Sequence, residues 1–133
     1  MDEKLEKFKQ EKERVIGYTA VPLETRFAKI RTQETNYGDF VTDIVKAFYN
    51  CDAVAINSGG IRIDALVEPG PIKFSLISNI FDDFIVVKLV PGNLVYDILE
   101  NSCSRYPAYE GRFLMVSGIR YTFDASKPPG ARV

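Results

Sequence analysis

The fold of this chain is decided by ten residues near its middle, Ala53–Arg62, which read AVAINSGGIR. Residues 53–56 form a short apolar run between polar turn residues, a pattern that predicts a strand. The paired glycines that follow would let backbone N–H groups approach a ligand with no Cβ in the way. Arg62, two residues on, can supply a bidentate fork to a phosphate or carboxylate. A strand-ending turn with a surface arginine explains the same residues, so the spacing alone leaves both interpretations open.

A helix is predicted immediately before this strand. Its apolar residues fall at positions i, i+1, i+4, i+5 and i+8 and share one face: Phe40, Val41, Ile44, Val45 and Phe48. Asn36 is placed to cap this helix, and Asp39 lies in the first turn, where a negative charge complements the helix dipole. Asp43 follows one turn later, and Arg31 and Glu34 are spaced for an ion pair. A structural role is the expectation for each of these residues taken singly.

The residues after Arg62 predict further strands and helices. A turn is expected at 69–71, a short strand at 72–74, a brief helical turn capped by Ser75, a buried strand at 84–90, a helix opened by 91–93, and two strands at 113–116 and 119–123. Leu94, Val95, Ile98 and Leu99 are expected on the inner face of that helix. Because strands and helices mix without regular βαβ spacing, the fold class is α+β, a mixed sheet packed with helices.

The N-terminal residues predict a helix over 3–14, with many charges and only a thin apolar stripe, which is typical of a linker or an edge element. An extended stretch over 18–23 follows, confined to a sheet edge by Pro22. This charged start has no apolar segment of the signal-peptide kind, and no run of the chain approaches the length of a membrane span. We therefore expect no membrane contact from this segment.

The composition excludes several classes of function. The chain has 133 residues with 17 basic and 18 acidic side chains, a balance that speaks against binding nucleic acid. It has no histidine, which excludes histidine bases, Ser-His-Asp triads and imidazole metal sites. Cys51 and Cys103 are compatible with two free thiols or with one bridge.

Two groups of side chains have both a structural and a functional interpretation. Phe81 could be part of the core or a stacking platform for a planar ring. The adjacent Asp82 and Asp83 point to different sides of an extended chain, so a metal site is not expected there. An aromatic cluster of Tyr106, Tyr109 and Phe113 is expected to serve packing.

Taken in order, four motifs resemble one family. They are R-x-x-E-x-N-x-G-D-x-x-x-D over residues 31–43, N-S-G-G-I-R over 57–62, I-F-D-D followed without a gap by a strand ending in glycine over 80–92, and G-R-F-L-M-V-S-G-I, Y-x-F-D and P-G-x-R-V over 111–133. This order resembles the 5'-nucleotidase C-terminal domain. Four ordered motifs are much more specific than any one alone.

The resemblance implies a two-domain enzyme that hydrolyses nucleoside monophosphates to nucleoside and phosphate. An N-terminal metallophosphoesterase domain would hold divalent metal ions, which are the implied cofactors, and this chain would hold none. Residues 1–16 would be a linker helix, and residues 17–133 the C-terminal, substrate-recognition domain, incomplete at its C-terminus. The implied binding residues for a nucleoside monophosphate or nucleoside are Arg31, Asn57, Gly59, Gly60, Arg62 and Phe81, with Asn57 on the base and Phe81 on one face of the purine. None of them is implied to be catalytic, and this chain alone is expected to hydrolyse nothing.

Some residues depart from the family pattern. Ile80 and Asp83 stand where the family has proline and asparagine, and the chain ends before the family's later N-F-x-x-x-G-G-D-G stretch, which carries a second clamp phenylalanine and a ribose-binding aspartate. An alternative is therefore a non-catalytic interaction module that keeps the fold with a decayed nucleoside site. The sequence leaves the preferred nucleotide and the cellular location open.

Overall fold

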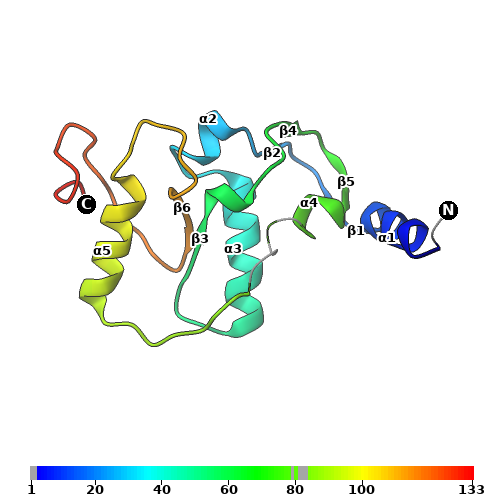
Figure 1. Ribbon diagram of the computed structural model, residues 1–133, viewed down its shortest axis with the longest axis horizontal. Helices are drawn as coiled ribbons and strands as arrows, with labels where there is room; N and C mark the ends of the chain where they lie inside the picture. The colour runs from blue at the N-terminus through cyan, green and yellow to red at the C-terminus, as the bar shows by residue number, and fades with distance from the viewer. Residues whose placement is uncertain (1–2, 79, 81–83) are drawn as a thin grey trace.

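The computed structural model describes residues 3–78, 80 and 84–133 (Figure 1). Its elements, in chain order, are α1 (Glu3–Glu13), β1 (Val15–Thr19), β2 (Leu23–Glu24), α2 (Phe27–Ile30), α3 (Asn36–Tyr49), β3 (Val54–Asn57), the 3-10 turn η1 (Ser58–Gly60), β4 (Leu66–Val67), β5 (Gly70–Lys73), α4 (Ser75–Ser78), α5 (Gly92–Cys103) and β6 (Leu114–Ser117). This mixture of helices and small sheets confirms the α+β class. The described strands form three two-stranded antiparallel sheets, β1–β5, β2–β4 and β3–β6, in place of the expected mixed sheet.

The β3–β6 pair forms the centre of the molecule. Val54 lies opposite Ser117, and Asn57 opposite Leu114. Figure 1 shows this pair between α3 on one side and α5 on the other. The backbone N–H of Leu114 donates to Ser102 Oγ of α5 at 2.8 Å, which ties α5 to the pair. The predicted strands at 53–56 and 113–116 are thus confirmed, each shifted by one residue.

Helix α3 is confirmed, but its cap differs from the prediction. Thr35 is the N-cap residue, and its side chain accepts from the backbone N–H of Gly38 at 3.2 Å. Asn36 lies inside the helix, and its side-chain oxygen accepts from the N–H of Glu24 at 3.0 Å while its amide donates to Pro22 O at 2.8 Å. The assignment of Asn36 as the cap is therefore wrong, because this side chain is used to hold the start of α3 against β2.

The buried face of α3 is narrower than the apolar pattern indicates. Val41 and Val45 are buried, whereas Ile44 and Phe48 are 50% and 80% exposed. Tyr37 and Thr42, which the apolar pattern omits, are fully buried. The buried side of the helix consists of Tyr37, Val41 and Val45 with Gly38 and Thr42 beside them. This side is displaced from the predicted face, so Ile44 and Phe48 are left exposed.

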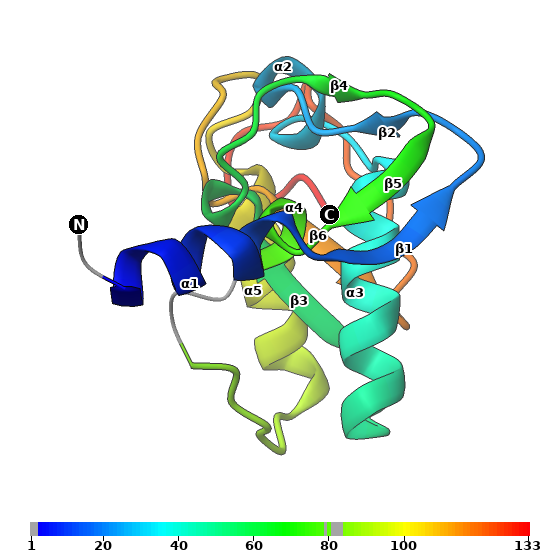
Figure 2. The same ribbon diagram turned by 90° about the vertical axis from the view of Figure 1, so that its right-hand side faces the viewer.

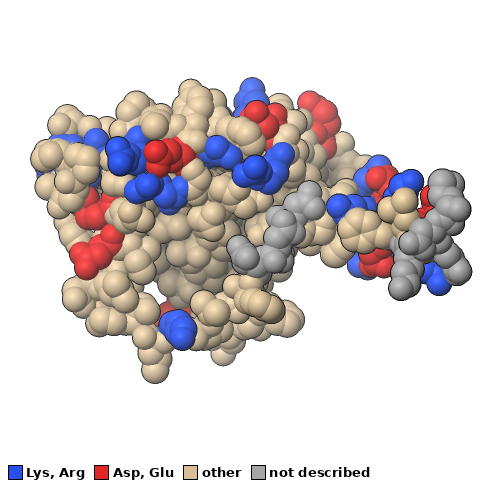
Figure 3. All heavy atoms as spheres, in the orientation of Figure 1, with Lys and Arg blue, Asp and Glu red and all other residues tan. Residues whose placement is uncertain are grey.

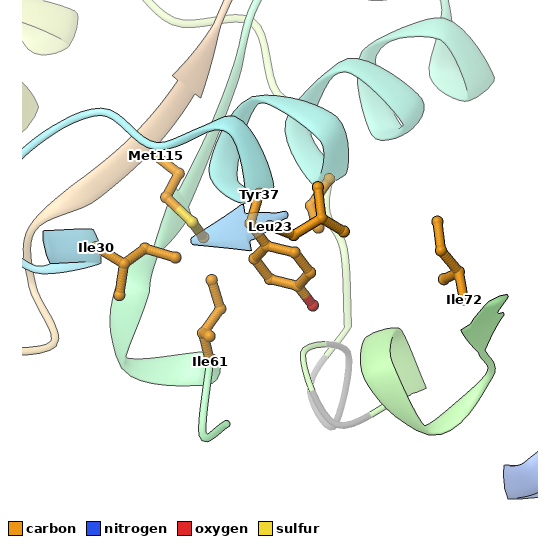
Figure 4. Close-up of a cluster of buried hydrophobic side chains, with 7 residues drawn as sticks. Leu23, Ile30, Tyr37, Ile61, Ile72 and Met115 are labelled. Atoms are coloured by element: carbon orange, nitrogen blue, oxygen red, sulfur yellow. The ribbon is translucent and has the colours of Figure 1, made fainter. Parts of the chain in front are cut away.

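One cluster of buried side chains joins the three sheets to α2 and α3 (Figure 4). It consists of Leu23, Ile30, Tyr37, Val41, Ile61, Ile72 and Met115. Tyr37 projects into its centre, and the Tyr37 hydroxyl donates to Leu76 O at 2.6 Å. Burial raises the pKa of the Tyr37 hydroxyl far above its ordinary value. The cluster includes Ile61, so the loop after β3 is anchored in the core by the residue before Arg62.

Helix α1 is confirmed and projects from the rest of the molecule (Figures 1 and 2). The side chain of Phe8 is 59% exposed. At the end of α1, Glu13 forms an ion pair with Lys73 of β5, and the Arg14 guanidinium lies over the Phe74 ring, 5.3 Å from its centroid. The predicted extended stretch at 18–23 is divided between the end of β1 and the start of β2.

The predicted buried strand at 84–90 is wrong. These residues form no ladder, and Phe84 and Leu89 are fully exposed, at 99% and 103%. A continuous apolar run predicts a strand only where another edge is available to pair with it. None of the described strands pairs with this segment.

The predicted strand at 119–123 is also wrong. That segment is held by aromatic contacts: the Phe123 ring lies 5.2 Å from Tyr106, 6.3 Å from Phe113 and 6.5 Å from Tyr121, measured between centroids. The expected aromatic packing cluster therefore exists, with Phe123 at its centre. Tyr109 is 57% exposed and lies outside it.

Helix α5 starts after Pro91, as predicted, and Leu99 on its inner face is buried, whereas Leu94 and Ile98 are 41% and 37% exposed. The same helix holds the end of the chain through Glu100, a buried carboxylate. It accepts from the backbone N–H groups of Gly130 at 3.1 Å and Val133 at 2.6 Å.

The question left open about the two cysteines is answered by their positions: Cys51 and Cys103 are free thiols. Across the described ranges, the helices are all too short or too polar to cross a lipid bilayer.

Candidate functional site

The glycine loop after β3 is built onto the other strand of the central pair. Beyond Asn57 the chain makes the η1 turn, in which the N–H of Ser58 donates to Phe113 O and the N–H of Gly59 donates to Gly111 O, both at 2.9 Å. These two bonds continue the β3–β6 ladder past the end of the strands. Ser58 is fully buried, so the loop is held against the interior of the protein at this residue.

Gly59 and Gly111 are in backbone contact. A Cβ on Gly111 would lie 2.7 Å from Gly59 Cα, and one on Gly59 would lie 3.0 Å from Gly111 Cα. The N–H of Gly59 is already donated to Gly111, so it is not available to a ligand. The sequence interpretation of this glycine is therefore changed: Gly59 is required by packing. Gly60 has more room, since its Cβ would meet Ile80 O at 3.4 Å, an ordinary contact.

A hollow of about 750 Å³ opens beside this loop. Asn57, Gly59, Gly60 and Arg62 are part of its lining. The other lining residues are mostly apolar and come from β3, the end of α3, segment 84–90, Ile80 and Ile98, together with Lys88. In Figure 3 this face of the molecule is hollowed below a row of basic side chains. A volume of this size accommodates a nucleoside-sized ligand.

Arg62 is an exposed cation with one hydrogen bond to the described residues. Its Nη1 donates to Gly59 O at 3.3 Å, and in the described part of the chain it has no carboxylate partner. A guanidinium without a carboxylate partner keeps most of its donors for an anionic ligand.

Arg31 lies near the same loop but does not line the hollow. Its Nη1 donates to Tyr109 O at 2.9 Å, and its guanidinium carbon lies 3.9 Å from the centroid of the Phe27 ring. The expected ion pair between Arg31 and Glu34 is not formed. The loop that contains Tyr109 leads directly to Gly111, and Gly111 contacts Gly59. Arg31 contacts the first of these two touching loops, and Arg62 follows the second.

Phe81, Asp82 and Asp83 lie outside the described residues. The sequence predictions for Phe81 as a stacking residue, and for the two aspartates as a site without metal, therefore stay predictions. Ile80, just before them, is half-buried and packs against the core cluster beside Gly60.

Sequence reasoning missed three residues that shape this region. Asp64, at φ 48°, accepts from the N–H of Phe27 at 2.7 Å and so holds the start of α2. Phe27 and Tyr109 both contact Arg31. The i, i+4 spacing of Phe27 and Arg31 is a signal that could have indicated the first contact, since side chains four apart meet on one helical face.

A second hollow, of about 610 Å³, lies between the start of α3 and β6 and has an acidic lining. Glu34, Asp39 and Asp43 line it, and Ser117 Oγ donates to Asp43 at 2.5 Å. Burial raises the pKa of Asp39, and the nearby carboxylates of Glu34 and Asp43 raise it further. The expected role of Asp39 is to complement the helix dipole with its negative charge. Burial and the neighbouring carboxylates disfavour that charge and so oppose this role.

We expect Asp39→Asn to raise the melting temperature at pH 7. Because the pKa of Asp39 is raised in the folded protein, folding favours its protonated form, and its charge costs stability at neutral pH. The advantage of the amide should shrink as the pH falls and the wild-type carboxyl becomes protonated. Thermal unfolding followed by circular dichroism between pH 3 and pH 7 tests this, with Asp97→Asn on α5 as the control. An equal difference in melting temperature between Asp39→Asn and wild type at pH 3 and at pH 7 would contradict this prediction.

The residues that the structure describes do not form a metal centre. The chain contains no histidine, and among the described residues no three cysteine, aspartate or glutamate side chains come together around a common point. The hollow combines the guanidinium of Arg62 and the amide of Asn57 with mostly apolar walls.

Several known proteins are similar to this chain over most of its length. The "Trifunctional nucleotide phosphoesterase protein YfkN" of Bacillus subtilis (strain 168) is 36% identical over 141 residues, which cover 98% of this chain and 10% of that protein. The "5'-nucleotidase" of Homo sapiens is 31% identical over 133 residues, covering 89% of this chain and 23% of that protein. The crystal structure of the 5'-nucleotidase precursor from Thermus thermophilus superimposes with a TM-score of 0.78 at 29% identity, over 96% of this chain and 26% of that one.

The chain thus spans about a quarter or less of the length of each of these proteins. The family described as "5'-nucleotidase, C-terminal domain" matches residues 15–133, which begin at β1 and include every motif quoted above. This chain belongs to the 5'-nucleotidase C-terminal domain family.

Proposed function

We propose that this chain is the nucleotide-recognition domain of a 5'-nucleotidase. It binds a nucleoside monophosphate and presents it to a metallophosphoesterase domain, where divalent metal ions support hydrolysis to nucleoside and phosphate. The observation that carries the proposal is the 750 Å³ hollow whose lining includes Asn57, Gly60 and Arg62, in a chain of this family. The metal ions belong to the partner domain in this proposal, because the described residues of this chain form no metal centre.

Each side chain would contribute binding and orientation. Arg62 supplies a cation to the phosphate or another polar group of the ligand, and Asn57, exposed at the end of β3, offers an amide to the base. Apolar atoms of β3 cover the ring, as in most small-molecule sites. Phe81 would stack on the purine, a role that rests on the family resemblance.

The experiment is to titrate the chain with adenosine 5'-monophosphate by isothermal calorimetry, and to repeat the titration with Arg62→Ala. We expect the variant to bind at least tenfold more weakly, because a charge-assisted hydrogen bond contributes about 1.5–3 kcal/mol. The side chain is exposed, so its loss should leave the melting temperature unchanged.

Arg120→Ala is the matched control, since Arg120 is an exposed arginine beside the other hollow. Equal affinity of Arg62→Ala and wild type would remove Arg62 from the site. Absence of binding to both adenosine 5'-monophosphate and adenosine would favour the alternative, an interaction module with a decayed site. The exposed apolar side chains of segment 84–90 fit that alternative.

A further inference from the structure

Arg31 is held by its surroundings in an unusual way for a half-exposed arginine. One face of its guanidinium lies over the Phe27 ring, 3.9 Å from the centroid. Nη1 donates to Tyr109 O at 2.9 Å, and Nε is enclosed without a partner among the described residues. Nη2 likewise has no acceptor in the described part of the chain, which leaves this edge for an incoming oxygen atom.

Phe27 is itself fixed from two directions. Its backbone N–H donates to Asp64 Oδ1 at 2.7 Å, which anchors the start of α2 to the segment after Arg62. Ile30, at the end of α2, is completely buried in the core cluster. Because α2 has only four residues, these two anchors fix the position of the ring relative to both loops.

An arginine loses considerable rotamer freedom when it binds a ligand, and holding it in place beforehand removes part of that cost. The face of an aromatic ring attracts a guanidinium laid flat on it. The Phe27 ring and the Tyr109 carbonyl both contact the Arg31 guanidinium in the observed orientation and favour it.

We propose that Phe27 is a positioning residue for nucleotide binding: its ring holds the Arg31 guanidinium so that the free edge meets a polar oxygen of the ligand. This inference rests on the proposed function and adds one contact to it: Arg31, which lies beside the hollow and not on its wall, reaches the nucleotide from the side of the Tyr109 loop. Phe27 does not touch the ligand and acts only through Arg31.

A double-mutant cycle on the 133-residue chain tests the proposal, with adenosine 5'-monophosphate as the probe and calorimetry as the readout. Phe27→Leu keeps an apolar side chain and removes the ring face, and Phe27→Tyr keeps the face. We expect Phe27→Leu to weaken binding about two- to fivefold, Phe27→Tyr to match wild type, and Arg31→Ala to weaken binding about tenfold. In the Arg31→Ala background, Phe27→Leu should have no further effect.

A second readout does not depend on binding. Ring current from Phe27 should shift the Arg31 Nε–H proton resonance upfield in wild type and Phe27→Tyr, and this shift should be lost in Phe27→Leu. This spectrum is recorded without ligand, so a merely destabilised variant can still be interpreted.

Each outcome decides between the two claims. If Arg31→Ala weakens binding and Phe27→Leu does not, the positioning role is overturned while the proposed function stands. If Phe27→Leu weakens binding equally with and without Arg31, Phe27 acts independently and the inference fails. If Arg31→Ala binds like wild type while Arg62→Ala does not, Arg31 leaves the site and the inference falls with it. If wild type binds no adenosine 5'-monophosphate, both claims fail.

Discussion

Gly118→Ala is expected to lower the free energy of unfolding by about 2–4 kcal/mol, a large part of the stability of a domain of this size. Gly118 follows β6 at φ 77°, a left-handed conformation that costs an L-residue about 1–2 kcal/mol. A Cβ there would also lie 2.2 Å from Asp52 O and 3.1 Å from Ala53 Cα, both on the segment leading into β3. The substitution should therefore separate the ends of β3 and β6.

Two other glycines separate the causes of this loss. Gly130 has φ 91° but nothing within 4 Å of its Cβ position, so Gly130→Ala should show only the conformational cost. Gly92 has open space and lies in the first turn of α5, where alanine is tolerated or favourable. Urea unfolding followed by circular dichroism measures the free energy of unfolding of each variant. We expect this free energy to be well below that of Gly130→Ala for Gly118→Ala, and near that of wild type for Gly92→Ala. Equal stability of the variants at 118 and 130 would contradict this prediction. It would show that the segment leading into β3 can move away from the new Cβ with no loss in the free energy of unfolding.

Helices α1, α3 and α5 and the central strand pair could be predicted from the sequence because their patterns are local, whereas the four-residue helix α2 was not predicted. The apolar spacing at residues 40–48 places α3, Pro91 marks the start of α5, and short apolar runs bounded by turn residues give β3 and β6. Details that depend on other segments could not be found in this way. Asn36 has a side chain that could cap a helix. It instead forms hydrogen bonds with the backbone of Pro22 and Glu24, twelve or more residues earlier in the sequence.

Segment 84–90 shows the limit most clearly. Its β-branched residues satisfy every local requirement of a buried strand, yet a strand exists only as a pair, and pairing is decided by distant parts of the chain. Phe84 and Leu89 are fully exposed here because the segment pairs with none of the described strands.

The sequence predictions for the candidate site agree with the structure on where one loop lies, and the binding roles stay predictions. Asn57, Gly59, Gly60 and Arg62 of the N-S-G-G-I-R loop line one hollow, whereas Ser58 and Ile61 are buried and do not line it. The role of Gly59 depends on Gly111, which lies 52 positions later and reaches it through the β3–β6 register. The two interpretations of the paired glycines, ligand approach and packing, therefore divide between Gly60 and Gly59.

This division leads to the prediction for Gly111→Ala. We expect the variant to lose about 2–3 kcal/mol of stability, because its Cβ would lie 2.7 Å from Gly59 Cα and backbone on both sides would have to move. The displaced loop carries Asn57 and Arg62, so affinity for adenosine 5'-monophosphate should fall at least tenfold, which corresponds to about 1.4 kcal/mol. Calorimetric titration and urea unfolding of the same preparation measure both effects.

Gly60→Ala is the matched control within the loop, since its Cβ would make only an ordinary contact at 3.4 Å. We expect this variant to unfold like wild type. If it nevertheless binds adenosine 5'-monophosphate more weakly, the Cβ obstructs the ligand, and close approach of the backbone is the role of Gly60. If Gly111→Ala keeps both its stability and its affinity, the contact between the two loops does not hold the site, and the packing role of Gly59 is wrong. Weaker binding with stability retained would instead mean that the loops shift at little cost, and that the position of Arg62 alone controls affinity.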